Sequence, residues 1–268
     1  MQTLEITPTD LPFIQVEGTF NFRAVGGYAI SSTDRLRVKP KLLYRCGELS
    51  AITEAGAKTL TSLNVKTVFD LRAKNEAEQY KTAPPNLESI KVIPTPIDQE
   101  LNFSQEYLTA FLRKFEVDEL NAFLDQYRGF LAGLGPALEA TIRHIIDVPE
   151  HPFITHCTVG KDRTGLLVAM ILLTLGVDEA EIAQEYALTT VGLEPVWEIL
   201  SVRMAKSEAF RNNPIGAQNL GASKMETMVA VLKMLKDEYG SAEKYIFQKT
   251  MLTPKDLEAF RKNALTKS

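Results

Sequence analysis

Ten consecutive residues constrain the fold of this chain more than any other segment. They read His156-Cys157-Thr158-Val159-Gly160-Lys161-Asp162-Arg163-Thr164-Gly165. A short apolar run, residues 152–155, precedes them, and a strongly apolar run, residues 166–173, follows them. A short apolar run bounded by turn residues is typical of a buried strand, and a longer one is typical of a buried helix. The segment therefore predicts a strand, a tight loop and a buried helix.

A loop of this kind turns backbone N–H groups inward above a helix N-terminus, an arrangement that binds a phosphate dianion. Such surroundings also favour the ionised form of a thiol, so we expect Cys157 to attack phosphorus and form a cysteinyl-phosphate. Arg163 has a planar guanidinium that can hold two phosphoryl oxygens, and Gly160 permits a positive φ. We expect the Thr164 hydroxyl to point at the sulfur, and His156 to orient the loop rather than act as the base.

Other interpretations of the segment exist. A cysteine before a buried helix is most often a small core residue. A nucleotide-binding P-loop does not fit, because Asp162 follows Gly160-Lys161 where Ser or Thr is needed, and Thr155 stands where the first glycine is needed. The strand, the helix, the glycine, the threonine and the histidine together favour the phosphate-binding interpretation.

The ten residues resemble the phosphate loop of the protein-tyrosine-phosphatase superfamily, and residues 160–165 resemble its microbial tyrosine and lipid (phosphoinositide) phosphatase branch. Three more segments resemble motifs of that branch in the same order: residues 21–27, 44–50 and 68–72. The C-terminal residues 239–257 also resemble this branch, so the resemblance covers nearly the whole chain. It implies an α/β fold with a central, mostly parallel sheet of about four to five strands and helices on both faces.

The resemblance also implies the site. We predict catalytic roles for Cys157, Arg163 and Asp162, phosphate contacts for Thr158, Val159, Gly160, Lys161 and Thr164, and supporting roles for His156, Asp70, Arg23 and Arg45. Three positions depart from the usual pattern: Ala24 replaces Asp, Cys46 replaces Ser, and Val159 replaces a smaller Ala. The bulk of Val159 would narrow the range of substrates.

The leaving group needs a proton, so a carboxylic acid near the loop is expected. The branch resembled here carries it inside the loop, which makes Asp162 the first choice. Asp70 is the second choice, because it ends a predicted strand where α/β sites gather. The alternative for Asp70 is a structural acceptor for Arg72 or Arg23. The alternative for Asp162 is a solvated carboxylate at a helix N-terminus.

The positively charged side chains of Lys161, Arg23 and Arg45 each have two interpretations. The resemblance links the pair formed by Lys161 and Arg163 to phosphoinositides, whose extra phosphates need extra positive charge. The alternative for Lys161 is a solvated side chain. Arg23 and Arg45 would hold either loop carbonyls or the substrate, and structural hydrogen bonding is the commoner use of such residues.

Composition excludes several functions. The 268 residues are 45% hydrophobic and 24% charged, as in soluble globular proteins, and the formal charge of −4 argues against nucleic acid as a partner. The N-terminal residues lack the features of a signal peptide, and the longest apolar run is too short for a membrane span, so a cytoplasmic location is expected. His144, His151 and His156 show no metal-ligand spacing, and no metal or other cofactor is expected. The oligomeric state stays open.

The two cysteines do not form a disulfide framework. Cys46 is interpreted as a buried thiol at a strand end. The alternative is a resolving partner that captures oxidised Cys157 as a reversible disulfide.

We expect one phosphatase domain over residues 1–268. Strands are predicted near residues 42–44, 67–71, 91–93 and 153–156, and helices over 53–63, 136–146 and 254–264. Ser223 and Glu226 predict a capping box for a helix that ends near Gly240. Two segments look like lid insertions: the aromatic-rich residues 100–131, and residues 193–221, which are predicted to be helical and then loose. Ordinary helix packing is the alternative for most of the aromatic side chains.

The predicted function is metal-independent phosphomonoester hydrolysis, with a phosphotyrosine protein, a phosphoinositide or both as substrate. One alternative keeps this chemistry for a small metabolite phosphate. Another is a pseudophosphatase that binds phosphate without hydrolysis, although the nucleophile and the arginine are both present. A rhodanese-type sulfur transferase also uses a loop cysteine, but the Arg-Thr ending of the loop favours phosphate.

Overall fold

A central sheet of five strands organises the protein. The computed structural model describes residues 12–31, 33–79, 87–97 and 101–267. The strands lie in the order β1 (Arg23–Val25), β4 (Leu43–Cys46), β7 (Phe153–His156), β5 (Thr67–Asp70) and β6 (Lys91–Pro94). β1 is antiparallel to β4, and the other neighbours are parallel. The predicted α/β fold with a mostly parallel sheet is confirmed, and β7 lies at its centre.

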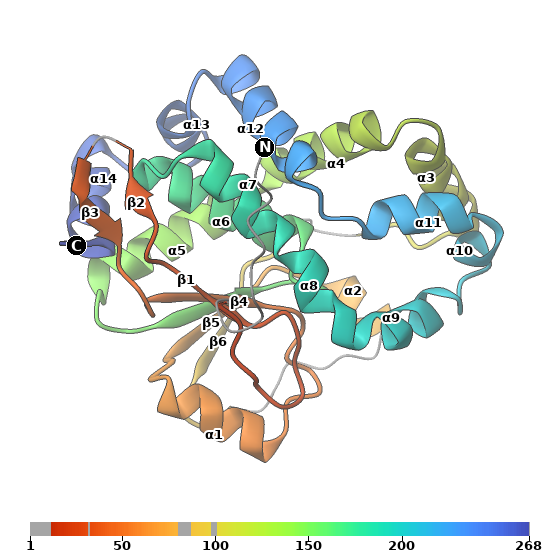
Figure 1. The fold of residues 1–268 in the computed structure, drawn as a ribbon, viewed down its shortest axis with the longest axis horizontal. Helices are drawn as coiled ribbons and strands as arrows, with labels where there is room; N and C mark the ends of the chain where they lie inside the picture. The colour runs from red at the N-terminus through yellow and green to blue at the C-terminus, as the bar shows by residue number, and fades with distance from the viewer. Residues whose placement is uncertain (1–11, 32, 80–86, 98–100, 268) are drawn as a thin grey trace, which may run out of the picture.

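Successive residues of the central strands face opposite sides of the sheet. Leu43, Phe69 and Phe153 belong to the larger core, together with buried apolar residues of α5 (Gly135–Asp147) and α6 (Asp162–Leu175). Tyr44, Val68 and Ile154 belong to the smaller core, together with Leu60 of α1 (Glu54–Ser62). Figure 1 shows α1 on one side of the sheet and α5 and α6 on the other.

α6 is buried along almost its whole length, which its apolar sequence predicts. It starts directly after the loop that follows β7, and it ends at Gly176, whose φ of 89° forms a left-handed cap. The strand–loop–helix predicted from the ten-residue segment is therefore confirmed, and it lies in the middle of the molecule.

The two predicted insertions are helical and pack on each other (Figure 1). The first holds α3 (Gln105–Val117) and α4 (Glu119–Gly133). The second runs through the end of α8 (Thr189–Leu193), η2 (Glu194–Val196), α9 (Trp197–Met204), α10 (Glu208–Asn212) and α11 (Pro214–Gly221). The Asn219 amide donates to the Phe115 carbonyl at 2.9 Å, and the Ala209 N–H donates to Gln105 Oε1 at 2.8 Å. The prediction of a loose end in the second segment was wrong, because Pro214 begins a helix there.

The remaining elements complete the fold. The other helices are α2 (Lys74–Gln79), α7 (Glu179–Ala187), α12 (Met225–Tyr239), α13 (Ala242–Lys249) and α14 (Pro254–Ala264). A second, three-stranded sheet consists of β2 (Ala29–Ile30), β3 (Thr33–Val38) and β8 (Leu265–Lys267) and was not predicted. Among the described residues, no helix combines the length and apolar character needed to cross a membrane.

The predicted capping box of Ser223 and Glu226 was wrong. α12 begins after Lys224, without a side-chain cap. Ser223 instead shares a hydrogen bond of 2.8 Å with the hydroxyl of Thr190, so the long-range contact replaces the local cap.

Candidate active site

The loop between β7 and α6 places Cys157 at the carboxyl end of the central strand. Cys157 is 2% exposed and follows His156, which pairs with Cys46 of β4 on one side and Asp70 of β5 on the other. Gly160 has a φ of 67°, and a Cβ there would lie 2.1 Å from the Cys46 carbonyl oxygen. Only glycine fits this position, as the loop chemistry predicted.

Side chains from other segments bind carbonyl groups of the loop. The Asn21 amide donates to the carbonyls of Val159 and Gly160, at 3.2 Å each. The Arg45 Nη2 donates to the carbonyls of Gly160 and Lys161, at 2.6 and 3.2 Å. The C=O and N–H groups of one trans peptide point in opposite directions, so the amides that follow these carbonyls point away from Asn21 and Arg45. The structure thus places Arg45 on loop carbonyls, one of its two predicted uses.

A buried carboxylate, Glu185 of α7, joins two of the predicted arginines. Its Oε1 accepts from Arg23 Nε at 2.8 Å, and its Oε2 accepts from Arg45 Nη1 at 2.5 Å. Arg23 also donates to the side chain of Asn21, so it supports the loop through that amide. Burial alone would raise the pKa of Glu185, but the two guanidinium charges outweigh it and hold the pKa below the ordinary 4.5.

A second carboxylate, Glu76 of α2, orients Arg163. The Arg163 Nη1 and Nη2 donate to the two oxygens of Glu76 at 2.6 and 2.7 Å, and the Thr158 hydroxyl donates to the same carboxylate. Glu76 is 2% exposed, and although burial favours its neutral form, Arg163 and Thr158 lower its pKa. A guanidinium is planar, so this two-pronged pairing with Glu76 fixes its direction.

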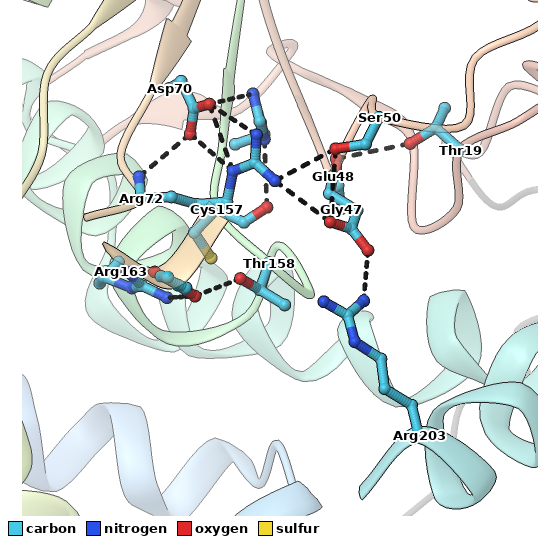
Figure 2. A network of polar contacts seen from close by, with 12 residues as sticks. Thr19, Gly47, Glu48, Ser50, Asp70, Arg72, Cys157, Thr158, Arg163 and Arg203 are labelled. Carbon is cyan, nitrogen blue, oxygen red and sulfur yellow. Dashed lines mark hydrogen bonds and ion pairs between the residues drawn. The ribbon is translucent and has the colours of Figure 1, made fainter. Parts of the chain in front are cut away.

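Asp70 lies in a network of paired charges (Figure 2). Both of its oxygens accept from the Arg72 guanidinium, at 2.8 to 3.2 Å. Arg72 also forms an ion pair with Glu48 at 3.1 Å. The Glu48 carboxylate in turn pairs with Arg203 of α9, and the backbone N–H of Glu48 donates to the Thr158 carbonyl at 3.0 Å. Burial alone would raise the pKa of Asp70, but His156 and Arg72 outweigh it and lower the pKa. The geometry is that of the structural acceptor for Arg72.

His156 and Thr164 are both fully buried. The His156 Nδ1 lies 3.1 Å from the Cys157 carbonyl, and because a carbonyl only accepts, Nδ1 carries the hydrogen. Burial lowers the pKa of His156, although the charge of Asp70 opposes the shift. The Thr164 hydroxyl is buried and makes no hydrogen bond to any described residue, so the expected bond to the sulfur is not formed here.

The ammonium of Lys161 is turned away from solvent. It donates to the carbonyls of Leu220 and Ala222, at 2.5 and 2.7 Å, and lies 4.8 Å from the centre of the Phe123 ring. Burial lowers the pKa of Lys161, although Asp162 opposes the shift. The side chain therefore connects the loop to the end of α11, whereas the sequence predicted a phosphate contact or a solvated lysine.

Asp162 is the first residue of α6, and its side chain is 14% exposed at the edge of the loop. It accepts a hydrogen bond from Tyr127 of α4. Asp162 and Asp70 thus differ in environment: Arg72 binds both oxygens of Asp70, whereas the hydrogen bonds and the ion pair of Asp162 with other described residues all involve Oδ1. Within the described ranges, no cluster of His, Cys, Asp and Glu side chains could hold a metal ion.

Cys46 is fully buried at the end of β4, as predicted. Burial raises the pKa of its thiol, and the neighbouring Cys157 raises it further, while a hydrogen bond with Thr19 opposes the shift. A reversible disulfide with oxidised Cys157 stays the alternative interpretation of Cys46.

The chain belongs to the tyrosine phosphatase family, whose sequence model matches residues 14–266. It is therefore a phosphatase of the protein-tyrosine-phosphatase type. It is similar to the triple specificity protein phosphatase PtpB of Mycobacterium tuberculosis, with 29% identity over 193 residues that cover 64% of this chain and 67% of the relative. A tyrosine-protein phosphatase of Nostoc commune is 25% identical over 210 residues, which cover 75% of this chain and 67% of the relative.

Two solved structures show a weak likeness to this chain. The core catalytic domain of the PP-IP phosphatase SIW14 from S. cerevisiae is 15% identical, with a TM-score of 0.36 over 77% of this chain and 97% of that domain. TpbA of P. aeruginosa is 18% identical, with a TM-score of 0.28 over 73% of this chain and 89% of TpbA.

Proposed function

We propose that the protein hydrolyses phosphomonoesters through a cysteinyl-phosphate on Cys157, with phosphotyrosine proteins as the main substrate class. The observation that carries the proposal is the loop itself: a buried cysteine, carbonyls bound by side chains from other segments, and an arginine oriented by Glu76. These groups supply a nucleophile, backbone amides and a fork for the phosphoryl oxygens. The names of the relatives, which are tyrosine and triple specificity protein phosphatases, support the substrate class.

The reaction has two steps. In the first, the Cys157 sulfur attacks phosphorus, the ester P–O bond breaks, and the leaving oxygen takes a proton from Asp162. In the second, water attacks phosphorus, the P–S bond breaks, and the water proton passes to Asp162 as inorganic phosphate forms. Arg163 and the loop amides hold the phosphoryl oxygens in both steps.

Phosphoinositides and small phosphate esters stay as alternative substrates. The sequence linked phosphoinositides to a second cation, Lys161. Because that ammonium binds the carbonyls of Leu220 and Ala222, it supports a connection to α11 more than a substrate contact. We further propose that residues 1–268 form one phosphatase domain in which the helices of residues 100–131 and 193–221 form a wall beside the loop.

The test of this function compares substrates and cysteine variants. We expect the wild type to hydrolyse phosphotyrosine peptides with a higher kcat/KM than phosphoinositide vesicles or small sugar phosphates. Cys157→Ser should be inactive, while Cys46→Ser, which changes the other buried cysteine, should stay active. Activity that survives in Cys157→Ser would contradict the mechanism, and a preference for vesicles or sugar phosphates would overturn the substrate class.

The two candidate acids are separated by their variants. Asp162→Asn should lower kcat roughly 10²- to 10⁴-fold with poor leaving groups, the range that general acid catalysis contributes. Asp70→Asn should instead lower stability, because it removes the charge that pairs with Arg72. Full turnover of aryl phosphates by Asp162→Asn would place the acid elsewhere.

A further inference from the structure

Three donors converge on one oxygen of Asp162. Its Oδ1 accepts from the Tyr127 hydroxyl at 3.2 Å and from the Tyr186 hydroxyl at 3.4 Å. The Lys161 ammonium lies 3.4 Å from the same oxygen. No hydrogen bond or ion pair joins Oδ2 to any residue in the described part of the chain. The carboxyl group is therefore oriented by one oxygen only.

Both tyrosines are built into the core. Tyr127 of α4 is fully buried, and its ring centre lies 5.8 Å from that of Phe130 in an edge contact. Tyr186 of α7 is 1% exposed and packs on Gly165, where a Cβ would come within 2.9 Å of the Tyr186 ring. Gly165 of the ten-residue segment thus makes room for this ring. Because both rings are held by packing, their hydroxyl groups have fixed positions beside Asp162.

The two hydroxyl groups stay protonated over the working pH range. Burial raises the pKa of Tyr127, and Tyr186 and Asp162 raise it further; burial and Asp162 likewise raise the pKa of Tyr186. Each tyrosine is therefore a donor toward Oδ1. An oxygen of a carboxyl group has two lone pairs, and three donors already share those of Oδ1.

We propose that Tyr127 and Tyr186 are positioning residues that reserve Oδ1 of Asp162 as an acceptor, so that Oδ2 carries and delivers the catalytic proton. This inference rests on the proposed function. In the first step the proton moves from Oδ2 to the leaving oxygen, and the negative charge left on the carboxylate is stabilised at Oδ1 by the hydroxyl donors. In the second step Oδ2 takes the proton from water.

The experiment measures kcat/KM for a series of aryl phosphates whose leaving groups differ in basicity. A good leaving group such as dinitrophenolate needs little protonation, whereas phenolate needs a proton. We expect Tyr127→Phe with Tyr186→Phe to lower kcat/KM roughly tenfold or more for phenyl phosphate and less than about twofold for dinitrophenyl phosphate. Asp162→Asn should show the same dependence with a larger loss.

Tyr245→Phe is the matched control, because Tyr245 is buried and its hydroxyl donates to the Leu131 carbonyl at 2.5 Å, outside this cluster. It should leave the leaving-group dependence unchanged. Circular dichroism and thermal melting check that each variant folds. If the double variant does not fold, the single variants Tyr127→Phe and Tyr186→Phe replace it, and each should lower kcat/KM more for phenyl phosphate than for dinitrophenyl phosphate, by a smaller factor.

Three results would overturn the proposal and separate its causes. An equal loss for all leaving groups, or no loss, would show that the tyrosines only support the structure. If Asp162→Asn shows no leaving-group dependence, Asp162 is not the acid and the tyrosines have no proton donor to position. If Cys157→Ser stays active, the proposed function itself fails.

Discussion

Around the phosphate loop, buried carboxylates fix the directions of the guanidinium groups. Arg163 is held by Glu76 and Arg45 by Glu185. Each pair is buried, so removing one partner leaves the other charge uncompensated. We therefore expect these acids to act on the proposed reaction through the arginines that they orient.

Substitution of Glu76 tests this at the residue scale. Glu76→Gln should lower kcat/KM roughly 10- to 100-fold, because a guanidinium that is no longer oriented loses part of the positioning effect. Glu78→Gln is the matched control, since Glu78 lies on the same helix, is 66% exposed and pairs only weakly with Lys74. Steady-state kinetics with one aryl phosphate would compare them, and equal activity of the two variants would contradict the role of Glu76.

Local sequence patterns point to the proposed catalytic residues more readily than to the residues that orient them. Cys157, Gly160 and Arg163 stand in a local pattern that the loop geometry requires, and the structure places them together. Glu76 and Glu185 stand on helices that carry other glutamates, so no local pattern marks them. Their roles depend on arginines 87 and 162 positions away, Arg163 and Arg23. Such long-range pairing cannot be predicted from one sequence.

At the scale of elements, Glu185 joins α7 to β1 and β4 through Arg23 and Arg45. Glu185→Ala should lower the free energy of unfolding by about 3–5 kcal/mol, because it leaves two buried guanidinium charges unpaired. Glu179→Ala, on the exposed end of the same helix, removes a surface pair with Lys236 and should cost about 0–1 kcal/mol. Urea unfolding at neutral pH would measure both changes.

If Glu185→Ala and Glu179→Ala had similar free energies of unfolding, the proposed role of Glu185 in joining α7 to β1 and β4 would be contradicted. The comparison is direct because both substitutions replace a glutamate of α7 by alanine. The two glutamates differ in burial and in the number of charged partners.

The elements were predicted where the pattern is long or strongly apolar. β7, α6 and α14 follow from their apolar runs and from Pro254, and α6 is the clearest case because nearly all of it is buried. The second sheet was missed because β2 has two residues and β8 has three, too few for an alternating pattern. The cap at Ser223 was wrong because a distant hydroxyl competes for it.

For the whole molecule, the buried acids predict loss of stability in acid. Burial would raise the pKa of Asp70, Glu76 and Glu185, but their charged partners outweigh it, so each pKa lies below its ordinary 3.8 or 4.5. Groups with a lowered folded pKa stabilise the protein fully above the unfolded value, and this stabilisation is lost as pH falls through the folded value. The free energy of unfolding should therefore be steady above about pH 5 and fall below about pH 4.5.

Urea unfolding at a series of pH values checks this expectation. Glu185→Gln, which removes one of the three groups, should start lower at neutral pH and fall less steeply in acid. A stability that is independent of pH down to about pH 3 would contradict the pairing of these acids in the folded protein.

The central claim is that the sulfur of Cys157 carries the phosphoryl group during turnover. Rapid acid quenching of the wild type with an aryl phosphate, followed by mass spectrometry of its peptides, tests this most directly. We predict a phosphate adduct on the peptide that contains Cys157, present during turnover and absent from Cys157→Ser. Turnover without any adduct on that peptide, or an adduct on another residue, would contradict the account.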